Sequence, residues 1–267
     1  DSAAVGAVCR EIARASGNAH VTGVVADFAS LAAVRSLAAD VAARHARLDV
    51  LVNNAGTSAR QRRVTGDGFE WLFGVNHLAP FLLTTLLLDK LKASAPARVV
   101  TVASMAYRRG TLELDDLNWE RRKYRSLKAY SDSKLANVLF TRELARRMEG
   151  RGVTTNCLHP GGVATNIWSR APAWAQPFIK VIGWLVFITP AQGAEPIVHL
   201  AASPEMSGRT GEYWNRMKRE EPIALAKDAS LADCLEARVQ ARYPDRPDTK
   251  VVHRLDKDTS GLLLLAF

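Results

Sequence analysis

Apolar and polar positions follow two different periods along the first 215 or so residues, and the two periods alternate. Runs of β-branched and other apolar residues predict strands at 20–28, 48–56, 97–106, 153–162 and 211–214. Apolar residues at helical spacing predict helices at 3–15, 30–46, 69–94, 129–150 and 191–203, with Ser30 as an N-cap. Strands separated by helices imply an α/β fold, in which a parallel sheet carries helices on both faces. Because ligands bind at the carboxyl ends of such strands, the residues that follow each strand are the candidates for function.

Composition and charge change this picture little. The 267 residues are 48% apolar and 24% charged, which is ordinary for a globular protein. The net charge of +9 is compatible with a polyanionic partner such as nucleic acid. The basic residues form no single run, however, and the densest cluster is confined to 118–125. This distribution favours a basic surface spread over the helices, and we expect no nucleic-acid partner for the main domain.

The cysteines and the longest apolar stretch bear on metal binding and location. Cys9, Cys157 and Cys234 lie far apart and lack metal-ligand spacing, which predicts no metal site and favours a reducing, cytoplasmic environment. The stretch 178–190 is too short to cross a membrane and contains Lys180, so we expect no transmembrane segment. It is typical of a buried or lid helix, with an interfacial membrane contact as the alternative.

The segment "YSDSK" (130–134) carries the clearest candidate chemistry. Tyr130 and Lys134 are four residues apart on a predicted helix, so their side chains share one face. A free tyrosine has a pKa of about 10, and a lysine ammonium beside it favours the phenolate and lowers that pKa. The pair could therefore exchange a proton with a substrate. The same spacing is also common on solvated helix faces. The pair by itself therefore does not identify a site, and other polar residues must lie close to it.

Candidate partners stand where the neighbouring strands end. Ser104 closes the predicted strand 97–106, "NNAG" (53–56) closes the strand before it, and "HPGG" (159–162) closes the strand after it. Asn76 lies inside the long helix, where asparagine is mildly disfavoured. Each of these features alone is an ordinary turn or cap. Their order along the chain is far more specific than any one of them.

That order resembles the short-chain dehydrogenase/reductase family over residues 1 to about 230. The motifs are "ADFAS" (26–30), "NNAG" (53–56), "VNHLAP" (75–80), "VASMA" (102–106), "YSDSK" (130–134) and "HPGGVATN" (159–166). The 26-residue separation of Ser104 from Tyr130 and the string "YSDSKLANVLF" resemble the retinol-dehydrogenase-like branch. The resemblance implies a Rossmann-type sheet, a nicotinamide cofactor and an alcohol or carbonyl substrate. NADP is the expected cofactor, with NAD as the alternative, and the substrate is expected to be lipophilic.

The resemblance also implies roles for individual residues. Tyr130 exchanges a proton with the substrate oxygen, Lys134 holds the cofactor ribose and tunes Tyr130, and Ser104 hydrogen-bonds the reacting oxygen. Asn76 orders a water that links Lys134 to solvent. The residues implied to contact the cofactor, besides Tyr130 and Lys134, are Asp27 on the adenine side, Asn53, Ala55 and Gly56 along the cleft, and Pro160, Gly161 and Thr165 at the nicotinamide end.

One part of the family pattern is missing from this chain. A complete member opens with a strand and a glycine-rich turn whose backbone N–H groups bind the pyrophosphate, followed by a second strand. No such glycine pattern precedes "ADFAS". We therefore expect an N-terminally truncated domain that lacks the first two strands and the glycine-rich turn, and we expect this chain to bind dinucleotide weakly or not at all.

The last segment has a different character. "VVHRLDKDTSGLLLLAF" (251–267) resembles the signature of RNA pseudouridine synthases, which implies Asp256 as a nucleophile beside Arg254. The alternative for this segment is a basic turn followed by an edge strand. We expect a dehydrogenase domain at 1–230 and a short foreign tail at 231–267.

Three functions remain open from the sequence. The first is an NAD(P)(H)-dependent oxidoreductase acting on a small alcohol or carbonyl compound, compatible with a homo-oligomer in the cytoplasm. The second is RNA modification through Asp256. The third is a non-catalytic remnant that exposes apolar strands.

Overall fold

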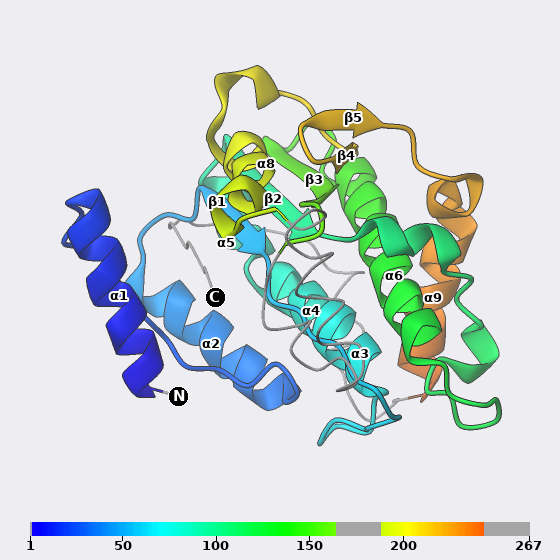
Figure 1. The fold of residues 1–267 in the computed structure, drawn as a ribbon. Helices are drawn as coiled ribbons and strands as arrows, with labels where there is room; N and C mark the ends of the chain where they lie inside the picture. The colour runs from blue at the N-terminus through cyan, green and yellow to red at the C-terminus, as the bar shows by residue number, and fades with distance from the viewer. Residues whose placement is uncertain (1, 164–187, 243–267) are drawn as a thin grey trace.

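Five strands form one sheet in the order β1-β2-β3-β4-β5 (Figure 1). In this computed structural model the described residues are 2–163 and 188–242, with side chains described up to residue 235. Strands β1 to β4 pair in parallel, and β5 joins β4 as an antiparallel hairpin at one edge. The strands are β1 (Val50–Asn53), β2 (Ala97–Val102), β3 (Val153–His159), β4 (Tyr213–Asn215) and β5 (Lys218–Glu220). The parallel sheet confirms the predicted fold class.

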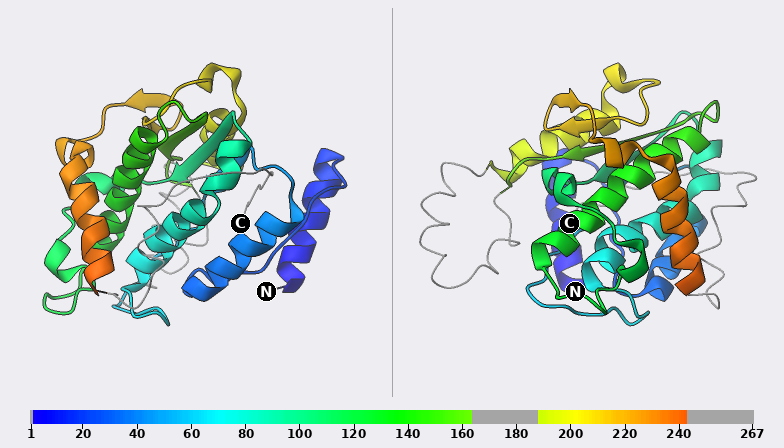
Figure 2. Two further views of the ribbon diagram at one scale, coloured as in Figure 1. Left: turned by 180° about the vertical axis from the view of Figure 1, so that it is seen from behind. Right: turned by 90° about the vertical axis from the view of Figure 1, so that its right-hand side faces the viewer.

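Helices cover both faces of this sheet (Figure 2). The α-helices are α1 (Ser2–Ser16), α2 (Leu31–Arg44), α3 (Trp71–Phe73), α4 (Ala79–Leu86), α5 (Leu88–Ala93), α6 (Ser126–Arg147), α8 (Pro190–Ala202) and α9 (Ala229–Arg242). Shorter turns of other helix types are η1 (Gly74–Leu78), η2 (Met105–Arg109), η3 (Leu114–Asp116), η6 (Pro204–Met206) and η7 (Ala224–Lys227). Ser30 caps α2 as predicted, since its hydroxyl accepts a hydrogen bond from the backbone N–H of Ala33 at 3.3 Å.

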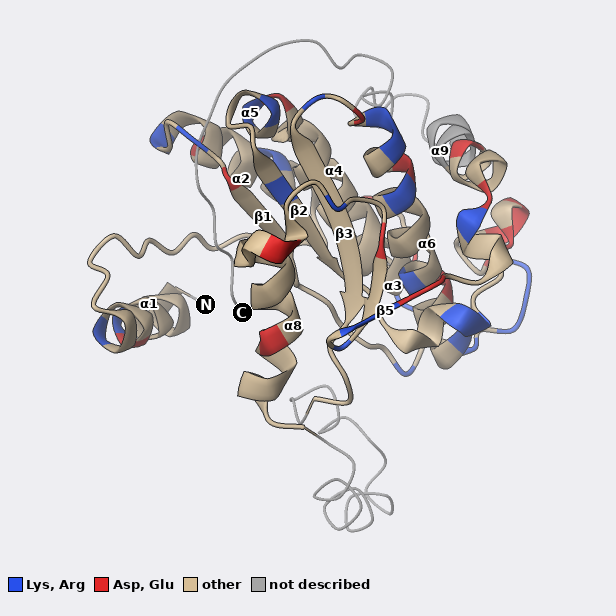
Figure 3. Cartoon of the chain, turned by 90° about the horizontal axis from the view of Figure 1, so that it is seen from above, with Lys and Arg blue, Asp and Glu red and all other residues tan. Residues whose placement is uncertain are grey.

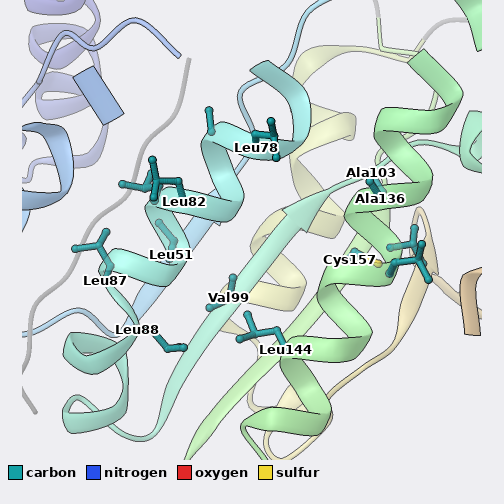
Figure 4. Packing of buried hydrophobic residues seen from close by; sticks show 14 of the residues in the cluster. Leu51, Leu78, Leu82, Leu87, Leu88, Val99, Ala103, Ala136, Leu144 and Cys157 are labelled. Atoms are coloured by element: carbon teal, nitrogen blue, oxygen red, sulfur yellow. The ribbon is translucent and has the colours of Figure 1, made fainter. Parts of the chain in front are cut away.

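The strands alternate their apolar side chains between two separate cores, as the period of two in a strand requires. One core packs α2, α4, α5 and α6 against the sheet, and Figure 4 shows Leu82 and Leu144 in the same cluster as Leu51 and Val99. The other core packs α8 against the opposite face. Successive strand residues divide between the first core (Leu51, Val99, Cys157, Tyr213) and the second core (Val52, Val100, Leu158, Trp214).

The predicted strand at 20–28 is wrong. These residues take no helical or strand conformation, although Val24, Ala26 and Phe28 pack partly against the larger core. The cause lies at the sheet edge. A strand needs a neighbour to satisfy its backbone N–H and C=O groups, and among the described residues β1 pairs only with β2. The segment therefore keeps its apolar contacts without a backbone ladder.

The predicted helix at 69–94 is not continuous. It divides into α3, the π-helical turn η1, α4 and α5, and Leu87 (φ −95°, ψ 0°) separates the last two. In η1 the backbone N–H of Ala79 reaches the carbonyl of Gly74, five residues back. A single π turn inserts one extra residue into the helix. This change is too small to alter the spacing of apolar residues in the sequence visibly. Such turns occur frequently at functional sites, and this one contains Asn76.

The proposed domain boundary near residue 230 falls at the start of α9. This helix lies beside α6 and places Leu235 in the larger core, with an ion pair between Arg147 and Asp233 at 3.3 Å. Asp256, Arg254 and nearly all of the 178–190 stretch lie outside the described residues. The division into two units, like the role of Asp256, stays a prediction.

Charged residues are dispersed over the described part of the chain. Lys and Arg residues are spread over several helices and β5, with acidic residues between them along the chain (Figure 3). No helix among the described residues combines the length and apolar character that crossing a bilayer requires. The described residues also contain no cluster of three or more His, Cys, Asp or Glu side chains arranged for a metal ion.

Candidate active site

The carboxyl ends of β1, β2 and β3 share one edge of the sheet because the three strands are parallel. The loop after β1, the turn η2 after β2, the π turn η1 and the first half of α6 meet at this edge. Ser104 lies two residues after the end of β2 and caps η2, its hydroxyl accepting a hydrogen bond from the N–H of Ala106 at 3.2 Å. Helix α6 supplies Tyr130 and Lys134 from consecutive turns.

Lys134 is a buried cation with unused hydrogen-bonding capacity. Its side chain is 4% exposed, and its Nζ donates to the backbone carbonyl of Val102 at 2.8 Å. That carbonyl is the one acceptor that the described residues provide, whereas an ammonium carries three donors. Burial lowers the pKa of Lys134 from 10.5 to about 8. A polar ligand that offers oxygen atoms would satisfy the remaining donors, and ribose hydroxyls have this chemistry.

Tyr130 and Ser104 form the second part of the site. A side-chain hydrogen bond with Ser104 lowers the pKa of Tyr130, but burial raises it by more, so the net shift is upward. This direction is opposite to the one expected from the sequence. The reason is geometric, since the Nζ of Lys134 lies 5.7 Å from the centre of the Tyr130 ring while the ring itself is largely enclosed. Without a ligand, Tyr130 is a neutral phenol at physiological pH.

Asn76 ties the loop after β1 to the helices. Its Oδ1 accepts from the backbone N–H of Thr57 at 2.7 Å, and its Nδ2 donates to the carbonyl of Thr57 at 3.1 Å. The same Nδ2 reaches the hydroxyl of Ser133 on α6 at 3.2 Å. The side chain therefore fixes a loop residue and a residue next to Lys134 at once. Its expected role in ordering a water stays a prediction.

The loop after β1 borders a small pocket. Phe28, Asn53, Ala55, Pro80 and Leu83 are among the residues that line it. The Nδ2 of Asn53, however, donates to the hydroxyl of Thr84 on α4 at 2.8 Å. The structure thus places Asn53 and Ala55 at this pocket, and the side-chain amide of Asn53 is already hydrogen-bonded to α4.

The remaining residues expected at the cofactor are more scattered. Pro160 and Gly161 follow β3, and Gly161 has φ +108°, a conformation that favours glycine. Asp27 is exposed on the loop before α2, where its carboxylate accepts from the N–H of Ala29 at 2.9 Å. No contact among the described residues joins Asp27 to Tyr130, Lys134 or Asn76. Thr165 lies outside the described residues.

Gly56 provides a direct test of whether this edge accommodates a ligand. A Cβ built on Gly56 would lie 3.6 Å from Asn76 Oδ1 and 3.6 Å from Lys134 Nζ, which is ordinary van der Waals contact. The free protein therefore tolerates a methyl group there, but the methyl occupies space directly beside the Lys134 ammonium. Together with the unused donors of Lys134, this open space fits a ligand that approaches the backbone closely.

We predict that Gly56→Ala leaves the free energy of unfolding within about 0.5 kcal/mol of the wild type and weakens NADPH binding about tenfold, a factor of ten being about 1.4 kcal/mol. Fluorescence titration and a denaturant melt measure the two quantities. Gly66→Ala is the matched control, because a Cβ at Gly66 meets nothing within 4 Å. Equal NADPH affinity in the wild type and Gly56→Ala contradicts a ligand at this position.

Two polar residues at this edge were not identified from the sequence. Asn137 lies on α6 three residues after Lys134, and His77 follows Asn76 in η1; both are buried. The signal for Asn137 was present, since Tyr130, Lys134, Asn137 and Thr141 recur at spacings that place them on one helix face. A buried helix usually presents apolar residues on its packed face. Four polar residues on one such face therefore indicate a functional site.

Comparisons with known proteins identify the family of the chain. The family model for short chain dehydrogenases matches residues 1–176, so the chain belongs to the short-chain dehydrogenase family, which is a family of oxidoreductases. The chain is 49% identical to human retinol dehydrogenase 14 over 77% of its own length and 62% of that protein's length. It is 43% identical to human retinol dehydrogenase 13 over 85% of its own length and 70% of that protein's length.

A solved structure shows the same fold. The short-chain dehydrogenase from Burkholderia cenocepacia J2315, in complex with NADP, superposes with a TM-score of 0.61 at 25% identity. The match covers 79% of this chain and 80% of that one.

Proposed function

We propose that this chain is an NAD(P)(H)-dependent oxidoreductase that interconverts an alcohol and a carbonyl group, with NADP as cofactor and a lipophilic substrate. One observation carries the proposal. A buried lysine with unused donors lies near a tyrosine whose pKa is raised by burial and partly lowered by the neighbouring Ser104 hydroxyl, at the carboxyl edge of a parallel sheet. NADP is favoured over NAD because the solved relative described above binds it.

When bound, the nicotinamide cofactor supplies or accepts the hydride. The chain's own residues manage the proton and the position of the substrate. Burial keeps Tyr130 protonated, which is the state that can deliver a proton to a substrate oxygen during carbonyl reduction. Ser104 would donate a hydrogen bond to the same oxygen, and the free donors of Lys134 would hold the ribose of the cofactor. The pocket residues Asn53 and Ala55, together with Gly56, would line the cleft.

The lipophilic character of the substrate is supported by the surroundings of Tyr130. Tyr130 packs against a buried apolar cluster formed by Ala59, Leu72, Trp119 and Ala129. This cluster places apolar side chains beside the tyrosine. The names of the human relatives point the same way, since retinol is a lipophilic alcohol.

Titration with NADPH tests the proposal, following energy transfer from the six tryptophans to the nicotinamide. Because the sequence predicts weak affinity, the titration should extend to millimolar NADPH, and turnover of retinal should then be measured above the observed Kd. We expect saturable energy transfer and consumption of NADPH that depends on retinal. A micromolar Kd contradicts the prediction of weak binding but supports the function. Absence of saturable binding up to millimolar concentrations contradicts the proposed function for this chain.

A further inference from the structure

A chain of buried hydrogen bonds runs behind the site and ends at Asn76. The Nδ1 of His77 lies 3.0 Å from the Oδ1 of Asn137, and the Nδ2 of Asn137 donates to the backbone carbonyl of Asn76 at 2.9 Å. His77 is 4% exposed and Asn137 is 2% exposed. The hydroxyl of Thr141 donates to the backbone carbonyl of Asn137 at 2.9 Å, so it occupies no polar atom of the Asn137 side chain. Both ends of the Asn137 amide are thus engaged with η1.

The amide of Asn137 dictates which nitrogen of His77 carries the proton. A carbonyl can only accept, so the Asn137 atom that faces the Asn76 carbonyl must be the NH₂ group. The Oδ1 of Asn137 then faces His77, and the Nδ1 of His77 must donate to it. Burial lowers the pKa of His77 to about 4, so the ring is neutral at physiological pH and this single tautomer persists.

Among the described residues, Asn137 is the hydrogen-bond partner of the imidazole ring, and no second one is present. Aromatic rings surround it, with centroid distances of 5.1 Å to Phe73, 6.0 Å to Phe81 and 6.4 Å to Phe140. An apolar residue would suit these neighbours, and a buried polar group in such surroundings costs free energy unless it is hydrogen-bonded. The single polar contact to Asn137 therefore explains why a histidine can occupy this position.

The last acceptor in this series of hydrogen bonds is the carbonyl oxygen of Asn76, which belongs to the π turn. The carbonyl of Asn76 lies inside η1, and the Asn76 side chain fixes Thr57 in the loop beside Gly56. Holding the carbonyl fixes the backbone orientation from which that side chain departs. A shift of η1 would move the Asn76 amide relative to both Thr57 and Ser133, and with it the loop that borders Lys134.

We propose that His77 and Asn137 are positioning residues for the oxidoreductase site, which hold the π turn so that Asn76 joins the loop after β1 to the helix of Tyr130 and Lys134. Their link to catalysis rests on the proposed function. The effect of the two residues on local geometry does not depend on the proposed function, and it can be measured without any substrate or cofactor.

Two substitutions of His77 separate the hydrogen bond from the ring. In His77→Asn the side-chain NH₂ takes the place of Nδ1, so the donor to Asn137 is retained while the ring is lost. In His77→Phe the ring is retained among Phe73, Phe81 and Phe140, and the donor is lost. His199→Phe is the matched control, because His199 packs at a tilt against Trp214, with the ring centroids 5.5 Å apart, and belongs to α8 on the other face of the sheet.

Amide hydrogen exchange of Thr57 is the cofactor-free measurement, since its N–H donates to Asn76. We expect His77→Phe to accelerate Thr57 exchange on the order of tenfold or more and His77→Asn to restore most of the protection, an effect on local opening rather than on global unfolding. Asn137→Leu, which removes both hydrogen bonds, should match His77→Phe. If Thr57 protection instead follows the melting temperature of each variant, the two residues are merely structural and the proposal is overturned.

The tautomer of His77 in the wild type is a second, independent measurement that remains available if a variant fails to fold. A ¹H–¹⁵N correlation spectrum of the imidazole at neutral pH should show the proton on Nδ1; a proton on Nε2 overturns the proposal. In turnover assays, kcat/KM should fall about tenfold or more for His77→Phe and less for His77→Asn. A wild type without turnover contradicts the proposed function and leaves the exchange and tautomer results to decide this inference.

Discussion

Tyr130→Phe is expected to lower kcat by about three orders of magnitude, within the range of roughly 10²–10⁴ that general acid–base catalysis contributes. The substitution removes only the hydroxyl, whose pKa is lowered by the neighbouring Ser104 and raised more by burial. The ring, which packs against Leu72 and Trp119, is retained. Steady-state turnover of retinal with NADPH measures the change, and NADPH affinity from energy transfer should stay within about threefold of the wild type, which is less than about 1 kcal/mol.

A second tyrosine supplies the control for this prediction. The hydroxyl of Tyr213 is buried and has no hydrogen-bond partner among the described residues, and its ring packs at a tilt against Tyr107, with the ring centroids 4.8 Å apart. Tyr213→Phe should therefore leave turnover unchanged. Turnover retained in Tyr130→Phe, with Tyr213→Phe also active, would remove Tyr130 from the proton-transfer role.

Lys134→Met is expected to abolish turnover and yet to stabilise the free protein. Burial holds the pKa of Lys134 at about 8 against 10.5 for the exposed side chain, and each pKa unit corresponds to about 1.4 kcal/mol. Removing the buried charge should stabilise the folded state by about 3 kcal/mol. Losing the hydrogen bond to the Val102 carbonyl should destabilise it by about 1–2 kcal/mol. We expect the free energy of unfolding at pH 7 to rise by roughly 1–2 kcal/mol, measured by denaturant unfolding without cofactor.

The pH dependence of this difference identifies its cause. Below pH 8 the lysine is protonated in both states, so the wild type carries the full cost of burying the charge. Between about pH 8 and 10.5 the unfolded chain still binds the proton and the folded chain does not, so the wild type gains stability as the pH rises. The advantage of Lys134→Met should therefore shrink between pH 8 and 10. A constant difference across this range would show that packing, and not the buried charge, accounts for it.

Much of the fold was accessible from the sequence because its causes are local. Strands β2 and β3 are largely buried, the apolar run of β2 predicts a strand directly, and α6 begins and ends within three residues of its predicted bounds. The hydroxyl of Ser30 can cap α2 from three residues away. The spacing of Tyr130 and Lys134 likewise places both on one helix face, whatever the rest of the chain does.

The failures have causes that no local pattern contains. Segment 20–28 has the composition of a strand, but a strand exists only where a neighbour accepts its hydrogen bonds, and β1 has its partner on one side only among the described residues. The upward shift in the pKa of Tyr130 depends on how completely the fold encloses the ring, which outweighs the helical proximity of Lys134. The antiparallel β5 is equally a product of the chain turning back on β4.

By itself, the sequence determined the class of fold, the helix that bears Tyr130 and Lys134, and the family to which the chain belongs, because spacing along a helix and the order of motifs are properties of the chain alone. Only the tertiary structure decided the hydrogen bonds, the burial and the pKa shifts of the site residues. The contact of His77 with Asn137 joins residues 60 positions apart, and the π turn that carries Asn76 depends on partners from α6 and from the loop after β1. Burial, which sets the pKa of Lys134 and of Tyr130, arises from the packing of all these elements together.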